Sequence, residues 1–201
     1  WRVRLGNMQP LDTHDTARFA TNAGPGTIPL AVGLSMTMPG LPVVFAGDEF
    51  GLVGVDGEAS RTPMPWGSEG EPEVAARLAL YRELVRLRRE HPVLATGGMR
   101  WVHVDDQAIA FVRESESESV LVVASRGDLD LELSALAVPG AARARELFGE
   151  ATLATADDGA VLLTADGPVF AAWALPGVQV PGAGVDAADA AAAADAGAVQ
   201  A

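Results

Sequence analysis

The sequence predicts an α/β fold followed by an antiparallel β-sandwich. The first half alternates short apolar runs with helical patterns, in the order strand, helix, strand, helix, which is typical of a parallel sheet. The second half contains seven short apolar runs separated by turn residues, which indicates a sandwich. We therefore expect two regions, 1–94 and 95–175, followed by an Ala/Asp-rich, disordered tail at 176–201.

Each element of the first half follows from a local pattern. Residues 7–11 (NMQPL) form a short, partly apolar stretch that suits a buried strand. Residues 28–38 (IPLAVGLSMTM) predict a largely buried helix, because a proline is tolerated in the first turn. Val43–Ala46 is an uninterrupted apolar run, as expected for a strand buried on both faces. Residues 73–90 predict the clearest helix, with apolar residues at i, i+3 and i+4, acids at its start and arginines at its end.

The strands of the second half are short apolar runs. Turn signals at Asp105-Asp106 and Asp158-Gly159 separate some of them. Trp101 and Trp173 fall within these runs and are predicted to be core or cross-strand residues. The candidate strands are 99–104, 108–113, 120–125, 129–133, 144–148, 160–164 and 168–174.

Composition excludes several classes of function. The chain has 201 residues, a net charge of −13, no Cys, and only Arg among its 14 basic residues. The acidic excess argues against nucleic acids and anionic membranes as partners. The absence of Cys excludes thiolate catalysis, disulfides and cysteine-ligated zinc. Because the sequence begins at Trp1 rather than Met, we expect a processed or truncated N-terminus.

The densest polar cluster follows the first predicted strand. His14, Asp15 and Arg18 fall within five residues and can bind a polyhydroxylated ligand or stabilise a developing cation, although a structural turn is the alternative. Asp48 and Glu49 follow the second strand in the same way, and for them a structural role is favoured. Because sites in α/β folds are built at the carboxyl ends of parallel strands, we expect both clusters at the same end of the sheet.

Four segments in the same order resemble the α-amylase superfamily, glycoside hydrolase family 13. They are LDTHDTARF, MPGLPVVFAGDEFGL, RTPMPW and YRELVRLRREHPVL, and they are most similar to the neopullulanase, cyclomaltodextrinase and α-glucosidase branch. The resemblance covers about residues 7–104. It implies that 1–94 is the C-terminal portion of a catalytic (β/α)₈ TIM barrel, containing strands 7–8 and their helices. It also implies that 95–175 is the C-terminal β-sandwich domain that follows this barrel.

The resemblance also implies roles for individual residues. Asp15 would be the third catalytic carboxylate, the transition-state stabiliser, and His14 would bind the sugar at the scissile bond. Arg18, Arg61 and Trp66 are the other candidates for substrate binding, the last two in the loop after the eighth strand. Thr13 stands where the family usually has Asn or Ser, while Asp48 and Glu49 would support the rim of the site without reacting.

The implied reaction is retaining cleavage of α-glucosidic bonds in maltooligosaccharides or α-glucans, with no cofactor. The nucleophile and the acid/base would lie on barrel strands before Trp1, so we expect an incomplete enzyme that is inactive alone. Any structural calcium would be held by the missing N-terminal half.

Two alternatives stay open: a transglycosylase or trehalose-forming isomerase of the same family, and a non-catalytic carbohydrate-binding or packing module. We expect the protein to be cytoplasmic rather than secreted.

Overall fold

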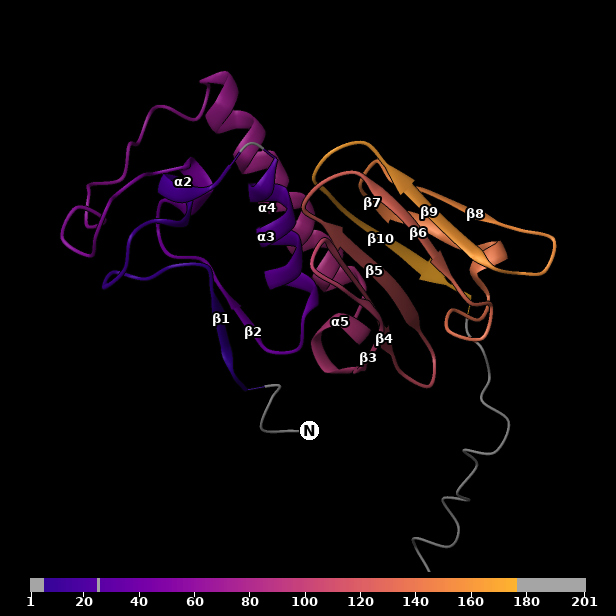
Figure 1. The fold of residues 1–201 in the computed structure, drawn as a ribbon. Helices are drawn as coiled ribbons and strands as arrows, with labels where there is room; N and C mark the ends of the chain where they lie inside the picture. The colour runs from indigo at the N-terminus through magenta and orange to yellow at the C-terminus, as the bar shows by residue number, and fades with distance from the viewer. Residues whose placement is uncertain (1–5, 25, 177–201) are drawn as a thin grey trace, which may run out of the picture.

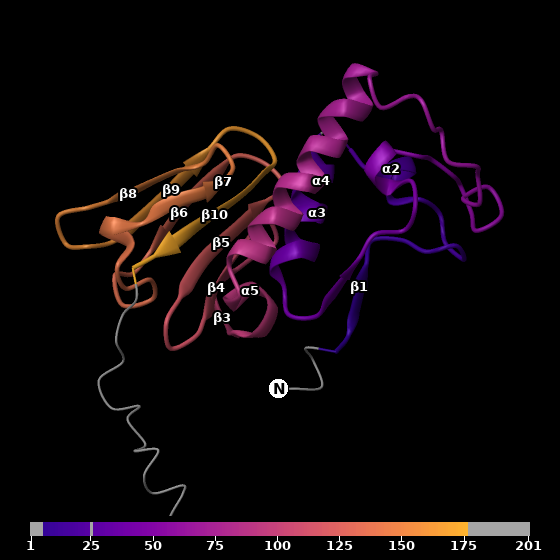
Figure 2. The same ribbon diagram turned by 180° about the vertical axis from the view of Figure 1, so that it is seen from behind.

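The protein is built in three layers, which Figures 1 and 2 show from opposite sides. The computed structural model describes residues 6–24 and 26–176. Helices form one layer, a five-stranded sheet the second, and a three-stranded sheet the third, while a short parallel pair of strands lies beside the helices. From residue 177 onward, the predicted tail lies outside the described residues.

Most of the regular structure in residues 6–96 is helical, whereas residues 97–176 are mainly β-strand. The first part contains β1 (Met8–Pro10), α2 (Phe19–Asn22), α3 (Thr27–Thr37), β2 (Leu41–Val43), the 3₁₀ helix η1 (Asp48–Phe50), α4 (Pro72–Glu90) and α5 (Val93–Thr96). The second contains β3 (Gly98–Val104), β4 (Ala108–Glu114), β5 (Ser119–Ser125), β6 (Leu129–Leu133), η2 (Ala141–Arg143), β7 (Arg145–Phe148), β8 (Thr152–Thr155), β9 (Val161–Ala165) and β10 (Val169–Leu175). The predicted helices at 28–38 and 73–90 are thus confirmed as α3 and α4.

The second half forms the predicted sandwich. One sheet has the antiparallel order β3-β4-β5-β10-β7, and the other has the order β6-β9-β8. Val112, Leu121 and Trp173 of the first sheet share a buried core with Leu131 and Leu163 of the second. Side chains alternate between the faces of a strand, so these residues account for only one face of the five-stranded sheet.

The other face of that sheet is covered by α3, α4 and α5. Phe111 and Val122, which alternate with the sandwich-facing residues, share a second core with Val32 and Leu84. The five-stranded sheet is therefore buried on both faces, which explains the continuous apolar runs of β5 and β10. The close approach of α3 requires Gly33, because a Cβ there would lie 2.4 Å from the ring of Phe170.

The parallel pair determines where the polar clusters lie. β1 pairs with β2 in parallel, with Met8 opposite Leu41 and Pro10 opposite Val43. The loops that follow the two strands therefore leave from the same end of the pair. This arrangement confirms that a strand–helix–strand unit brings the cluster around Asp15 close to the segment around Asp48.

Three predictions about strands are wrong. The two parallel strands are not buried in this structure, because Met8 of β1 is 64% exposed and Leu41 of β2 is 54% exposed. The second parallel strand is Leu41–Val43 and does not extend over Val43–Ala46, because the chain already turns at Phe45, whose carbonyl accepts the Asp48 N–H at 3.0 Å. The sandwich contains eight strands among the described residues instead of seven. The additional one, β8, is a short edge strand with mostly exposed residues, so its sequence has no core-facing alternation.

Candidate functional site

Three of the residues predicted for the site lie together at the end of β1. His14 Nε2 and Asp15 Oδ2 are 3.2 Å apart, and Arg61 Nη2 donates to Asp15 Oδ1 at 3.2 Å. Arg61 Nε also donates to the His14 carbonyl at 3.1 Å. The Asp15 side chain is 69% exposed. The solvent-accessible carboxylate of Asp15 therefore lies between the imidazole of His14 and the guanidinium of Arg61.

A compact turn fixes the backbone of this group. The Thr13 hydroxyl accepts the Asp15 N–H at 3.2 Å, and the Thr16 hydroxyl accepts the Thr13 N–H at 3.0 Å. The Thr16 N–H donates to the Thr13 carbonyl at 3.2 Å, which closes the turn. Hydroxyl residues stabilise such turns because their side chains bond to the nearby backbone. Thr13 thus holds this turn through both its hydroxyl and its backbone N–H.

Arg18 lies beneath this turn and is only 1% exposed. It donates to Asp48 Oδ1 at 2.8 Å, to the Ala46 carbonyl at 2.8 Å and to the Ser60 carbonyl at 3.0 and 3.2 Å, and its guanidinium lies 3.8 Å from the Phe45 ring centroid. These contacts join the loop after β1 to the loop after β2. Direct contact between Arg18 and a substrate stays a prediction, and the buried position favours positioning the site instead.

Asp48 supports the site from below. It accepts the Arg18 bond and also the Phe45 N–H at 3.2 Å. Burial, followed by the nearby negative charge of Asp12, raises the pKa of Asp48 from 3.8 to about 6, although Arg18 opposes this shift. Asp48 is only 8% exposed, and a supporting role for it stays a prediction.

The loop at 47–61 packs tightly against the turn. The Gly54 carbonyl accepts the Arg18 N–H at 2.8 Å, and the Ser60 hydroxyl donates to the Thr16 carbonyl at 2.9 Å. A Cβ at Gly57 would lie 2.9 Å from the Asp15 Cα and 3.0 Å from the His14 carbonyl oxygen. Glycine is thus needed at 57 by close backbone approach. Sequence reasoning missed this role, because nothing in the pattern around residue 57 indicates which backbone it touches.

Trp66 lies in the same long loop but outside the group around Asp15. Its side chain is 75% exposed, and its ring meets Phe50 edge-on, with ring centroids 5.9 Å apart. An exposed aromatic face of this kind can stack on a sugar ring. Contact between Trp66 and a substrate stays a prediction.

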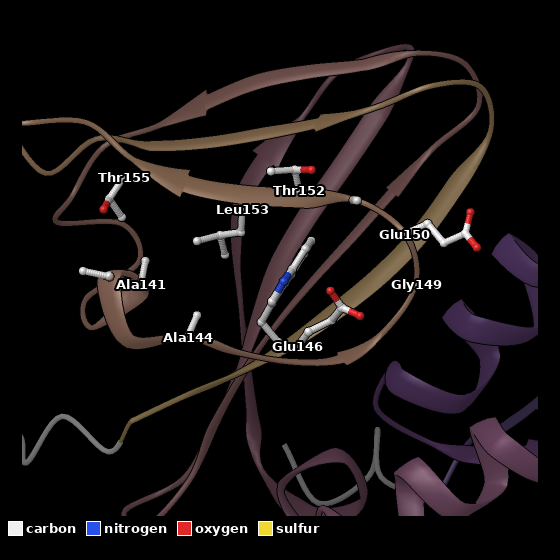
Figure 3. A pocket seen from close by; sticks show the side chains of 11 residues that line it. Ala141, Ala144, Glu146, Gly149, Glu150, Thr152, Leu153 and Thr155 are labelled. Carbon is white, nitrogen blue, oxygen red and sulfur yellow. The ribbon is translucent and has the colours of Figure 1, made fainter.

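The sandwich contains a separate groove, which sequence reasoning did not detect. Figure 3 shows it along the side chains of Glu146, Thr152 and Leu153, and its volume is about 500 Å³. It opens where β7 and β8, the edge strands of the two sheets, separate. Trp173 also lines it but is only 3% exposed, which confirms its predicted place in the core. Trp101 forms the predicted cross-strand pair with Phe111 but is 48% exposed at the edge of its sheet.

Within the described residues, no group of three or more His, Asp or Glu side chains has the arrangement of a metal site. In the same part of the chain, no helix combines the length and apolar character needed to cross a bilayer.

Comparisons with known proteins identify relatives of this chain. No protein-family model matches it. It is 38% identical over 123 residues to neopullulanase 2 of Thermoactinomyces vulgaris. This match covers 59% of this chain and 21% of the relative. A cyclomaltodextrinase of a Bacillus species is 34% identical over 117 residues, covering 56% of this chain and 21% of the relative. The chain thus spans about a fifth of the length of these curated relatives.

Solved structures show the same relationship at the level of the fold. The α-amylase of Geobacillus thermoleovorans, determined with acarbose, superposes with a TM-score of 0.73 at 22% identity, covering 85% of this chain and 39% of that chain. A cyclomaltodextrinase superposes with a TM-score of 0.65 at 28% identity, covering 84% of this chain and 29% of that chain. This chain is thus similar in sequence to the neopullulanases and cyclomaltodextrinases of the α-amylase superfamily, it fits a C-terminal part of such proteins, and its fold is similar to that of an α-amylase.

Proposed function

We propose that this chain forms the C-terminal part of an enzyme that cleaves α-glucosidic bonds of maltooligosaccharides or α-glucans with retention. In this proposal, 1–94 completes a (β/α)₈ barrel, of which β1 and β2 are the last two strands, and 95–175 is the sandwich domain behind it. The observation that carries the proposal is the exposed Asp15, held beside His14 at the carboxyl end of a parallel strand. Active sites of such barrels are built at that end of the strands.

Asp15 would act on the charge that develops during bond cleavage. A retaining glycosidase uses a carboxylate nucleophile and a carboxylic acid about 5–5.5 Å apart, and its transition state resembles an oxocarbenium ion. A third carboxylate lowers the barrier if it is aimed at the place where positive charge forms. We assign this role to Asp15. The two reacting carboxylates would come from polypeptide that this sequence does not include.

The neighbours of Asp15 would fix its direction and bind the sugar. Arg61 holds Asp15 Oδ1 and the His14 carbonyl, so it restricts the rotation of the carboxylate. His14, which is exposed beside Asp15, would donate to a sugar hydroxyl. Trp66 would stack on a sugar farther along the rim, and Arg18 would position the turn from below.

Two other functions are compatible with parts of this structure. A transglycosylase or trehalose-forming isomerase would use the same carboxylates and differ in the access of water to the intermediate, and the products formed from maltose separate it from a hydrolase. A carbohydrate-binding sandwich without catalysis would need exposed aromatic faces. Trp173 is buried, which favours a packing role for the sandwich, and the half-exposed Trp101 packs edge-on against Phe111.

The test starts from the coding region upstream of Trp1. A reading frame that continues upstream with an Arg-x-Asp strand end and a later Glu strand end supports the proposal, as does release of sugars from maltooligosaccharides by the encoded protein. The 201-residue chain alone should release none. Hydrolysis by this chain alone would contradict the assignment of the nucleophile and acid/base to other polypeptide.

A further inference from the structure

A small, partly open cavity lies below the loop that carries His14 and Asp15. It is lined by residues of that loop, of α2, of η1 and of α4, among them Asp12, Phe19, Ala20, Asp48, Arg77 and Tyr81. Its volume is about 10 Å³. This volume is the space open to the centre of a water-sized sphere, so at least one water molecule fits. The space therefore suits a ligand about the size of one water molecule.

One polar atom in this cavity lacks a protein partner. Asp12 is 5% exposed, and its Oδ2 accepts the Phe19 N–H at 2.6 Å. Its Oδ1 is buried and has no hydrogen-bond donor within the described residues. The nearest guanidinium nitrogen, Arg18 Nη1, is 3.9 Å away and is directed to Asp48 instead. A buried carboxylate oxygen without a donor is costly, so a ligand that donates a hydrogen bond is strongly favoured here.

The chemistry of the lining favours water over a metal cation. Arg18 and Arg77 place two positive charges beside the two carboxylates, which disfavours a further cation. A hard cation such as Ca²⁺ also requires six to eight oxygen ligands, whereas Asp12, Asp48 and Tyr81 are the lining residues with side-chain oxygens. Water needs only two to four polar partners, and Asp12, Asp48, Arg77 and Tyr81 are available.

We propose that Asp12, Asp48 and Tyr81 form a binding site for one ordered water molecule, which donates a hydrogen bond to Asp12 Oδ1. This water would link α4, through Tyr81, to the carboxylate that holds the Phe19 N–H, and so to the base of the loop that carries Asp15. The site does not depend on the proposed glycosidase activity, because it belongs to the folded chain itself.

A crystal structure of the full chain at a resolution that shows ordered water tests the proposal. We expect a single density peak at about 2.6–3.2 Å from Asp12 Oδ1. A dry cavity would overturn the proposal. So would a shift of the Arg18 guanidinium onto Asp12 Oδ1, or a metal ion with short contacts to both carboxylates.

A second measurement uses Tyr81, the only tyrosine of the chain. Tyr81→Phe keeps the ring and removes the hydroxyl, so the water should become weakly occupied and the melting temperature should fall. Arg82→Met is a suitable control, because Arg82 is the exposed next residue on α4. A full-occupancy water and an unchanged melting temperature in Tyr81→Phe would remove Tyr81 from the site.

Discussion

At the scale of single residues, neighbours in sequence were easier to predict than distant partners. His14 and Asp15 are adjacent, and the pattern after an apolar strand was sufficient to single them out. Arg61 was predicted only for the rim, and its bond to Asp15 spans 46 positions, which no spacing rule reveals. The burial of Arg18 was also unpredictable, because charged side chains are almost never fully buried unless a partner is present.

Asp48 provides a prediction about pH at this scale. Its pKa is raised from 3.8 to about 6, so the folded state binds a proton more tightly than the unfolded state. The stabilisation from this proton is fully present below pH about 4 and is lost as the pH rises through about 6. The melting temperature of the wild type should therefore exceed that of Asp48→Asn by the largest margin at acidic pH. If this difference in melting temperature instead grew as the pH rose from about 4 to about 7, the raised pKa of Asp48 would be contradicted.

At the scale of elements, the long periodic segments were predictable and the short ones were not. α4 has an amphipathic pattern over 19 residues, and β5 and β10 have apolar runs that reflect burial on both faces. By contrast, α2 has four residues and β8 has four mostly exposed ones, so tertiary contacts decide their conformation.

Two buried or partly buried arginines connect the end of α3 to α4, α5 and β4, which composition alone does not indicate. Arg113, which is fully buried, donates to the carbonyls of Thr37, Leu94 and Gly97. Arg88 adds bonds to the carbonyls of Met36 and Gly40 at 2.6 Å. Both side chains satisfy carbonyls at or just beyond the C-terminal end of α3, where a helix leaves acceptors unpaired and favours positive charge. Burial, followed by the charge of Arg88, lowers the pKa of Arg113 to about 10, so it remains charged at neutral pH.

The contact between the two loops of the site gives a prediction at the same scale. Gly57→Ala places a Cβ 2.9 Å from the Asp15 backbone, so one loop must move. We expect a lower melting temperature and, in the active enzyme, a loss of kcat that exceeds the change in KM. Gly70→Ala is the matched control, because a Cβ at Gly70 meets nothing within 4 Å. Equal behaviour of the two variants would show that the loops are not packed as described.

At the scale of the whole molecule, the sandwich and the helices share a core. Val32 of α3 and Leu84 of α4 belong to one buried core with Phe111 and Val122 of the five-stranded sheet. Sequence patterns predicted both parts but could not show this shared surface, because the contacts join residues that lie far apart in the chain. The sandwich is thus a structural support for α3 and α4, in addition to any other role.

Residues 1–94 should therefore be unstable when they are separated from the sandwich. A chain of residues 1–94 loses the sheet that covers α3 and α4 and leaves apolar side chains such as Val32 and Leu84 exposed to water. We expect this piece to aggregate or to remain poorly soluble. Gel filtration and thermal unfolding test the prediction. A soluble monomer of 1–94 that unfolds cooperatively would contradict it.

The role of Asp15 is the central claim, and its most direct test is the kcat of the complete enzyme. Asp15→Asn removes the negative charge but keeps the side-chain shape, so kcat on maltooligosaccharides should fall by at least about 10³-fold while the melting temperature stays close to that of the wild type. Asp130→Asn, at an exposed position on β6, should leave kcat unchanged. A near-normal kcat for Asp15→Asn would contradict the role assigned to Asp15 and, with it, the proposed function of this site.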